Sequence, residues 1–91
     1  MGNSIYIEVS IIVSNIRMPY GISDEEVISK TARSLGFKKA DLVYSGIYRE
    51  SIDLRHGTIS KLYSVEFDHC SDAVEQKLAD GNPNIYFKPN A

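Results

Sequence analysis

The first apolar segment of the chain alternates apolar and polar residues. β-Branched side chains occupy every second position, at Ile5, Ile7, Val9, Ile11 and Val13. This period of two predicts a long strand that buries its odd-numbered residues. The strand is expected to end within residues 18–21, because Pro19 donates no ladder hydrogen bond and Gly21 permits a turn.

The next segment has the features of a short amphipathic helix. Ser23 can cap the free amides of the first turn, and Glu26 occupies the capping-box position three residues later. The buried stripe is expected to contain Val27, Ile28, Thr31, Ala32 and Leu35. Gly36 is expected to stop the helix in a left-handed conformation, with Phe37 folding back on the last turn.

Two further strands are predicted to form a hairpin. Residues 41–53 are rich in apolar side chains and predict the second strand, with Gly46 as a candidate bulge. A turn at residues 56–57 leads to a third strand over residues 59–67. Its residues Tyr63 and Phe67 share the parity of Val65, so we expect both aromatic side chains to face the helices.

A second helix and a short apolar segment complete the pattern. The helix is expected to begin at residues 71–72 and to close at residues 80–81, with one apolar side made of Ala73, Val74, Leu78 and Ala79. Residues 85–87 then form either an edge strand or part of a linker. With the edge strand, the order is that of a ferredoxin-like α+β fold, a two-layer βαββαβ unit with two helices on one face of an antiparallel sheet. Without it, the domain is a three-stranded βαββα unit.

Composition narrows the classes of function. The 91 residues make one domain, and the net charge of −2 gives no sign of the basic stripe of a general nucleic-acid binder. The single cysteine, Cys70, cannot form an internal disulfide and suits a reducing compartment. No apolar run approaches the roughly 20 residues that span a bilayer, and the start lacks the basic leader of a signal peptide. We therefore expect a cytoplasmic location and no membrane partner.

The sequence predicts no catalytic, cofactor-binding or metal-binding residue. Its six glycines are isolated, so a dinucleotide fingerprint and a Walker loop are both absent. His56, His69 and Cys70 are the only soft metal ligands, and neighbours on a strand end point to opposite sides. A nucleophile–base arrangement of Cys70 with His69 and Asp72 would lie at a turn without a predicted cleft. A buried or half-buried inert thiol is the preferred interpretation of Cys70.

The tyrosines leave RNA binding open, because aromatic residues on the middle strands of this fold can stack on bases. We expect the sheet face without helices to carry Tyr6, Glu8, Ser10, Leu62, Ser64 and Glu66. Such a face is acidic and has few aromatic residues. Nucleic acid is therefore the least favoured partner.

The densest polar stretch, residues 49–55, lies at the predicted hairpin tip. One interpretation is a solvated turn, in which Asp53 accepts hydrogen bonds from local backbone amides. The other is a charged docking element made of Arg49, Ser51, Asp53 and Arg55. Spacing alone favours the solvated turn.

Two segments, taken together, resemble a known family. The first is V-S-N-I-R-M-P at residues 13–19, followed by the acidic residues 24–26 and a helix that ends in Leu35-Gly36; the second is S-I-D-L-R at residues 51–55, followed by the strand at residues 62–67. In this order they resemble the N-terminal domain of the bacterial uncharacterised FAD-dependent dehydrogenase family, a group of NAD(P)/FAD-dependent oxidoreductases. The resemblance covers roughly residues 9–68. The family usually has a basic residue at the position of Glu50, and lysines where this chain has residues 56–57.

The resemblance implies a non-catalytic accessory domain. Residues 1–81 would form this domain, and residues 82–91 would be its edge strand or a linker toward a flavin-binding domain. That further domain would hold FAD, carry the redox chemistry and be the partner of this one. None of the matching positions is a family cofactor position, and Asp53 and Arg55 match only as motif residues. The alternatives are a free-standing ferredoxin-like ligand-binding or regulatory module that dimerises through its open sheet face, and a weak RNA binder.

Overall fold

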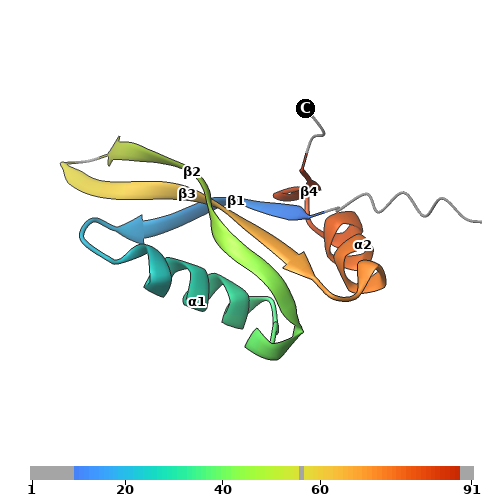
Figure 1. The fold of residues 1–91 in the computed structure, drawn as a ribbon. Coiled ribbons are helices and arrows are strands. Elements are labelled where there is room, and N and C mark those ends of the chain that lie inside the picture. The colour runs from blue at the N-terminus through green and yellow to red at the C-terminus, as the bar shows by residue number, and fades with distance from the viewer. Residues whose placement is uncertain (1–9, 56, 89–91) are drawn as a thin grey trace, which may run out of the picture.

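The computed structural model describes residues 10–55 and 57–88 as four strands, two α-helices and one 3₁₀ turn. In chain order these are β1 (Ile11–Pro19), α1 (Asp24–Ser34), the 3₁₀ turn η1 (Lys39–Asp41), β2 (Leu42–Arg55), β3 (Thr58–His69), α2 (Asp72–Gly81) and β4 (Ile85–Phe87). The strands form one antiparallel sheet in the order β2-β3-β1-β4 (Figure 1). This order confirms the predicted two-layer α+β fold of ferredoxin-like type.

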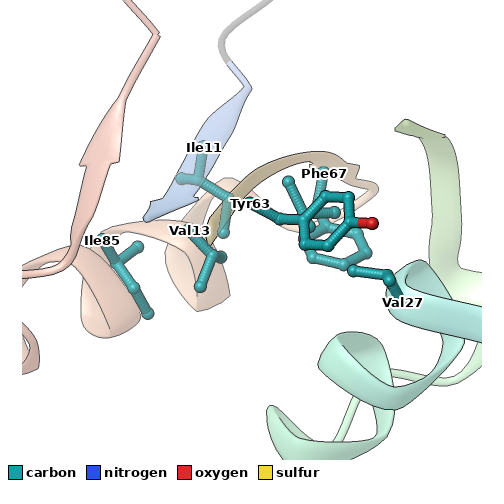
Figure 2. Packing of buried hydrophobic residues seen from close by; sticks show 7 residues of the cluster. Ile11, Val13, Val27, Tyr63, Phe67 and Ile85 are labelled. Carbon is teal, nitrogen blue, oxygen red and sulfur yellow. The ribbon is translucent and has the colours of Figure 1, made fainter. Parts of the chain in front are cut away.

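The core lies between the sheet and the two helices. Two rows of side chains cross all four strands on this side, namely Ile47, Val65, Val13 and Ile85, and Ser45, Phe67, Ile11 and Phe87. Val27 enters from α1 and packs with the buried Tyr63 and Phe67, as Figure 2 shows. The prediction that these two aromatic residues face the helices is therefore confirmed.

A bulge in β1 changes which of its residues are buried. Val13 pairs with Val65 and Ile16 with Tyr63, so two residues of β1 face one residue of β3. Within this bulge Asn15 has a φ of 60°, and its side chain donates to the Asn84 side chain at 2.7 Å. The buried set consequently shifts from odd to even positions after the bulge, where Ile16 and Met18 pack against the core.

Odd-numbered burial is confirmed at Ile11 and Val13, but Ile12 is fully buried as well, on the opposite face. The strand ends at Pro19, inside the range expected from the proline and glycine. The predicted strand residues 5–9 lie outside the described residues.

Both ends of α1 follow the expected capping chemistry. The Ser23 hydroxyl accepts a hydrogen bond from the Glu26 N–H at 3.3 Å. At the other end Gly36 has a φ of 76°, and the Phe37 N–H donates to the Ala32 carbonyl at 2.9 Å. These contacts form a Schellman motif, which turns the chain back toward the sheet.

The bulges of β2 lie beside Gly46 rather than at it. The register against β3 shifts around Val43 and again around Tyr48, whereas Gly46 pairs directly with Glu66. The prediction of a bulge at Gly46 is therefore wrong. The glycine accommodates a neighbour instead, because a Cβ at this position would overlap the hydroxyl of Tyr44.

The second helix is confirmed, but half of its predicted apolar side is exposed. Glu75 is fully buried, Leu78 and Ala79 are half-buried, and Ala73 and Val74 are exposed. The Glu75 Oε1 accepts a hydrogen bond from the His69 N–H at 2.7 Å. This contact ties α2 to the end of β3, and the spacing of Glu75, Leu78 and Ala79 matches one face of a helix. Of the two interpretations for residues 85–87, the structure has the edge strand.

Candidate functional site

The β2–β3 hairpin extends beyond both β1 and the helices. Its pairing continues to Arg55 opposite Thr58, whereas β1 pairs with β3 only as far as Pro19 opposite Ser60. The 11-residue α1 is about 16 Å long, but the 14-residue β2 spans about 46 Å. Figure 1 shows the end of the hairpin projecting past α1. We call residues 49–55 and 58–61 the hairpin arm.

One carboxylate joins the outer face of the hairpin arm to β1. The Nη2 of Arg17 donates to Oδ2 of Asp53 at 2.8 Å, and Nε of Arg55 lies 3.3 Å from the same oxygen. The side chain of Asp53 is only 14% exposed, whereas the side chains of Arg17 and Arg55 are 49% and 65% exposed. Asp53 therefore lies in a strand between two guanidinium groups, and not in the solvated turn that spacing alone favoured.

This contact crosses a whole strand. Arg17 lies opposite Leu62 of β3, and Leu62 lies opposite Ser51 of β2. Arg17 therefore reaches over β3 to bind a residue two strands away. Sequence reasoning missed this partner of Asp53, because Arg17 and Asp53 are 36 positions apart. One signal could have suggested the pair: Arg17 and Asp53 each belong to one of the two segments that carry the family resemblance.

The outer face of the hairpin arm carries an excess of positive charge. Arg49 is exposed, and its guanidinium carbon lies 5.8 Å from the centre of the Tyr48 ring. With Arg17 and Arg55, this part of the outer face holds three arginines and the single carboxylate of Asp53. Ser51, the remaining candidate residue, is exposed on the same strand face. The structure therefore brings the four residues of the predicted docking element onto one side of the hairpin arm.

The opposite face of the hairpin arm carries three exposed apolar side chains beside the Lys61–Glu50 ion pair. Ile52 is 62% exposed, Leu54 is 71% exposed and Ile59 is 51% exposed. Leu54 pairs directly with Ile59, so these side chains share the face that packs against helices elsewhere in the sheet. The sequence placed Ile52 and Ile59 in strands but did not predict their exposure. The unequal lengths of the predicted helix and strands are the signal that could have identified the overhang.

The centre of the helix-free sheet face differs from the expectation of an acidic, thinly aromatic surface. The Glu66 side chain is 13% exposed, accepts a hydrogen bond from the Ser10 hydroxyl at 2.8 Å and pairs with Lys88 at 3.3 Å. The Lys88 ammonium also lies 5.8 Å from the centre of the Tyr48 ring. Ser10 is itself buried.

The remaining residues expected on this face have mixed outcomes. Leu62 and Ser64 lie there as expected, each only partly buried. Tyr6 and Glu8 lie outside the described residues. The register adds Tyr44 and Tyr86, which share this face with Glu66 and Ile12. The prediction for this face considered only residues of the first and third strands, whereas Tyr44 and Tyr86 come from β2 and β4.

The residues considered as metal ligands or nucleophiles have structural contacts. The Nδ1 of His69 accepts a hydrogen bond from the Ser71 N–H at 2.9 Å, and the His69 ring packs 5.1 Å from that of Phe37. Cys70 is exposed, so the interpretation of a buried or half-buried thiol is wrong; its backbone N–H, rather than its side chain, is held by Asp41. His56 lies outside the described residues. In the described part of the chain, no three histidine, cysteine or acidic side chains are grouped as a metal site would need.

No helix in residues 10–55 and 57–88 combines the length and the apolar character needed to cross a membrane. Comparisons with protein families, with curated proteins and with solved structures gave no match to this chain.

Proposed function

We propose that this chain is a non-catalytic accessory domain that docks onto a partner domain through the hairpin arm. The partner is a flavin-binding oxidoreductase domain that holds FAD, of the kind implied by the family resemblance. The observation that carries this proposal is the ion pair between Arg17 and Asp53. These residues belong to the two sequence segments on which the resemblance rests, and the pair joins those segments into one surface.

The exposed apolar face of the hairpin arm supports a docking role. Ile52, Leu54 and Ile59 leave large apolar side chains in water, and a two-stranded hairpin gains little stability by itself. Burial against a partner would remove this surface from water at roughly 25 cal/mol per Å² of apolar area. An apolar centre beside charged and hydroxyl-bearing residues also matches the usual anatomy of a protein interface.

The charged face of the hairpin arm supports selectivity for the partner. Asp53 holds Arg17 and Arg55 in place, so both guanidinium groups are positioned before the partner arrives. Positioned arginines bind carboxylates with two parallel hydrogen bonds and lose less side-chain freedom on binding. We infer that the partner presents an acidic surface beside an apolar one.

Two observations would test this function. The gene is expected to continue past the codon for Ala91 into a flavin-binding segment with a G-x-G-x-x-G fingerprint, and a stop codon at that point would contradict the proposal. The 91-residue chain is also expected to bind that flavin-binding segment when the two are mixed as separate polypeptides, as measured by calorimetry.

Variants connect the binding to the hairpin arm. Substituting both Ile52→Glu and Leu54→Glu is expected to weaken binding at least tenfold, because charge replaces the apolar contact. Ala73→Glu with Val74→Glu is the matched control, since it places the same two charges at exposed apolar positions on α2. Equal binding by the arm variant and the control would place the interface elsewhere. A tight dimer of the chain alone, retained in the arm variant, would favour the module that dimerises through its open sheet face instead.

A further inference from the structure

A second recognition feature lies where α1, η1 and β2 meet, away from the apolar face of the hairpin arm. An open groove of about 260 Å³ runs between the C-terminal half of α1 and the start of β2. Figure 1 shows β2 passing beside this end of α1. The groove floor is apolar and contains Ile28, Ala32, Phe37 and Leu42. The groove can therefore accommodate an apolar side chain of a ligand.

Cations border this groove. Arg33 and Lys39 both line it and both are exposed, and none of its lining residues in the described part of the chain is acidic. Neither cation forms an ion pair with another described residue. The hydroxyls of Ser29 and Ser45 complete the lining. The groove thus combines an apolar floor with an unneutralised positive rim, which complements an apolar group that has a carboxylate next to it.

One wall of the groove is an edge strand with free main-chain groups. In the sheet of described residues β2 pairs only with β3, so its other side presents a row of unpaired N–H and C=O groups. Residues 44–47 lie between the two bulges of β2 and keep a regular register against β3. Ser45, within this regular stretch, also lines the groove. A strand added here would therefore run along the groove.

We propose that the groove binds an extended peptide segment of a partner protein, which adds as a strand to the edge of β2 at residues 44–47. One apolar side chain of the peptide occupies the floor formed with Ile28 and Phe37, and an acidic side chain two residues along, on the same face of the added strand, pairs with Arg33 and Lys39. Strand addition beside a helix supplies main-chain hydrogen bonds for affinity and a side-chain pocket for selectivity. The groove volume falls below the roughly 300–1,000 Å³ of typical small-molecule sites, which favours a peptide as occupant.

The test uses the 91-residue chain and a fluorescein-labelled nine-residue peptide with leucine and glutamate in turn at its odd positions and serine at its even positions. Leucine and glutamate then lie on the same face of the added strand. Binding is followed by fluorescence anisotropy and by amide chemical shifts. We expect saturable binding, with the largest amide shifts in residues 44–47 and at Ala32 and Arg33. A peptide with lysine in place of each glutamate is expected to bind at least tenfold more weakly, because it meets the two rim cations with like charge.

Two variants with the same change in net charge distinguish binding at the groove from attraction by the overall charge of the chain. Substituting Arg33→Glu and Lys39→Glu is expected to weaken binding of the acidic peptide at least tenfold. The control substitutes Lys30→Glu and Lys77→Glu, which are exposed residues that do not line the groove. Dispersed amide spectra confirm that each variant is folded. Equal weakening by both variants would overturn the proposal, as would the absence of binding by the unaltered chain.

Modified probes test strand addition directly. A leucine–glutamate peptide with N-methylated backbone amides cannot donate ladder hydrogen bonds, so we expect its binding to be at least tenfold weaker. Equal affinity of the methylated peptide would overturn strand addition. Phenylacetate provides an apolar group and a carboxylate without a peptide backbone. If it shifted the same amides as strongly as the peptide, the groove would be a small-molecule site and the proposal would be wrong.

Discussion

The Nη2 of Arg17 donates a hydrogen bond to Oδ2 of Asp53 at 2.8 Å across the intervening strand β3. Arg55 approaches the same carboxylate oxygen from within β2, at 3.3 Å. This arrangement ties the hairpin arm to β1 near the end of that strand at Pro19, so that only residues 54–55 and 58–59 project beyond the pairing with β1. The ion pair therefore links the orientation of the arm to the rest of the sheet.

A double-mutant cycle on Arg17→Ala and Asp53→Ala measures this link. Because the Arg17 side chain is 49% exposed, solvent screening limits the interaction, and we expect a coupling energy of about 0.5–1 kcal/mol. Urea unfolding of the four proteins gives the value. The Lys61–Glu50 pair, at 3.8 Å, is the comparison and is expected to show weaker coupling. A coupling energy of zero between Arg17 and Asp53 would show that the pair does not stabilise the arm.

The apolar residues of the core and those of the hairpin arm are expected to respond differently to truncation. Phe67 is fully buried, so Phe67→Ala is expected to lower the free energy of unfolding by about 3–5 kcal/mol. Leu54 is mostly exposed, so Leu54→Ala is expected to lower it by less than about 0.5 kcal/mol. Chemical denaturation of the 91-residue chain measures both. A loss of several kcal/mol for Leu54→Ala would mean that the arm packs against this chain itself.

The two helix starts offer a matched comparison of capping serines. The Ser23 side chain accepts a hydrogen bond from the first turn of α1, whereas Ser71 makes no such bond at the start of α2. We expect Ser23→Ala to lower the free energy of unfolding by about 0.5–2 kcal/mol. Ser71→Ala is expected to have a smaller effect in the same assay. The reverse order would contradict the capping geometry at Ser23.

Much of the fold could be predicted from local signals in the sequence. Ser23 and Gly36 mark the limits of α1 because a side-chain cap and a left-handed glycine act within a few residues of the helix end. The parity of Tyr63, Val65 and Phe67 placed β3 correctly because this stretch of β3 is regular. Local chemistry was sufficient where the element itself is regular.

The remainder depended on contacts between distant parts of the chain. The bulge at Asn15 is held by Asn84, almost 70 positions away, and it reverses the alternation of β1. The partner of Asp53, Arg17, lies in a different strand. From neighbouring residues alone, the carboxylate of Asp53 could only be placed in a turn. The exposure of Leu54 follows from the difference in length between β2 and α1. Each of these features requires the register of the assembled sheet.

Hydrogen–deuterium exchange tests the docking role of the hairpin arm most directly. The measurement compares residues 49–55 in the isolated 91-residue chain with the same residues in the longer flavoprotein that we propose as its parent. We expect slower exchange of these amides in the longer protein, because the partner domain covers the arm. Residues of the α1 helix serve as the internal reference. Equal exchange of residues 49–55 in both proteins would contradict the proposal that the arm is a docking surface.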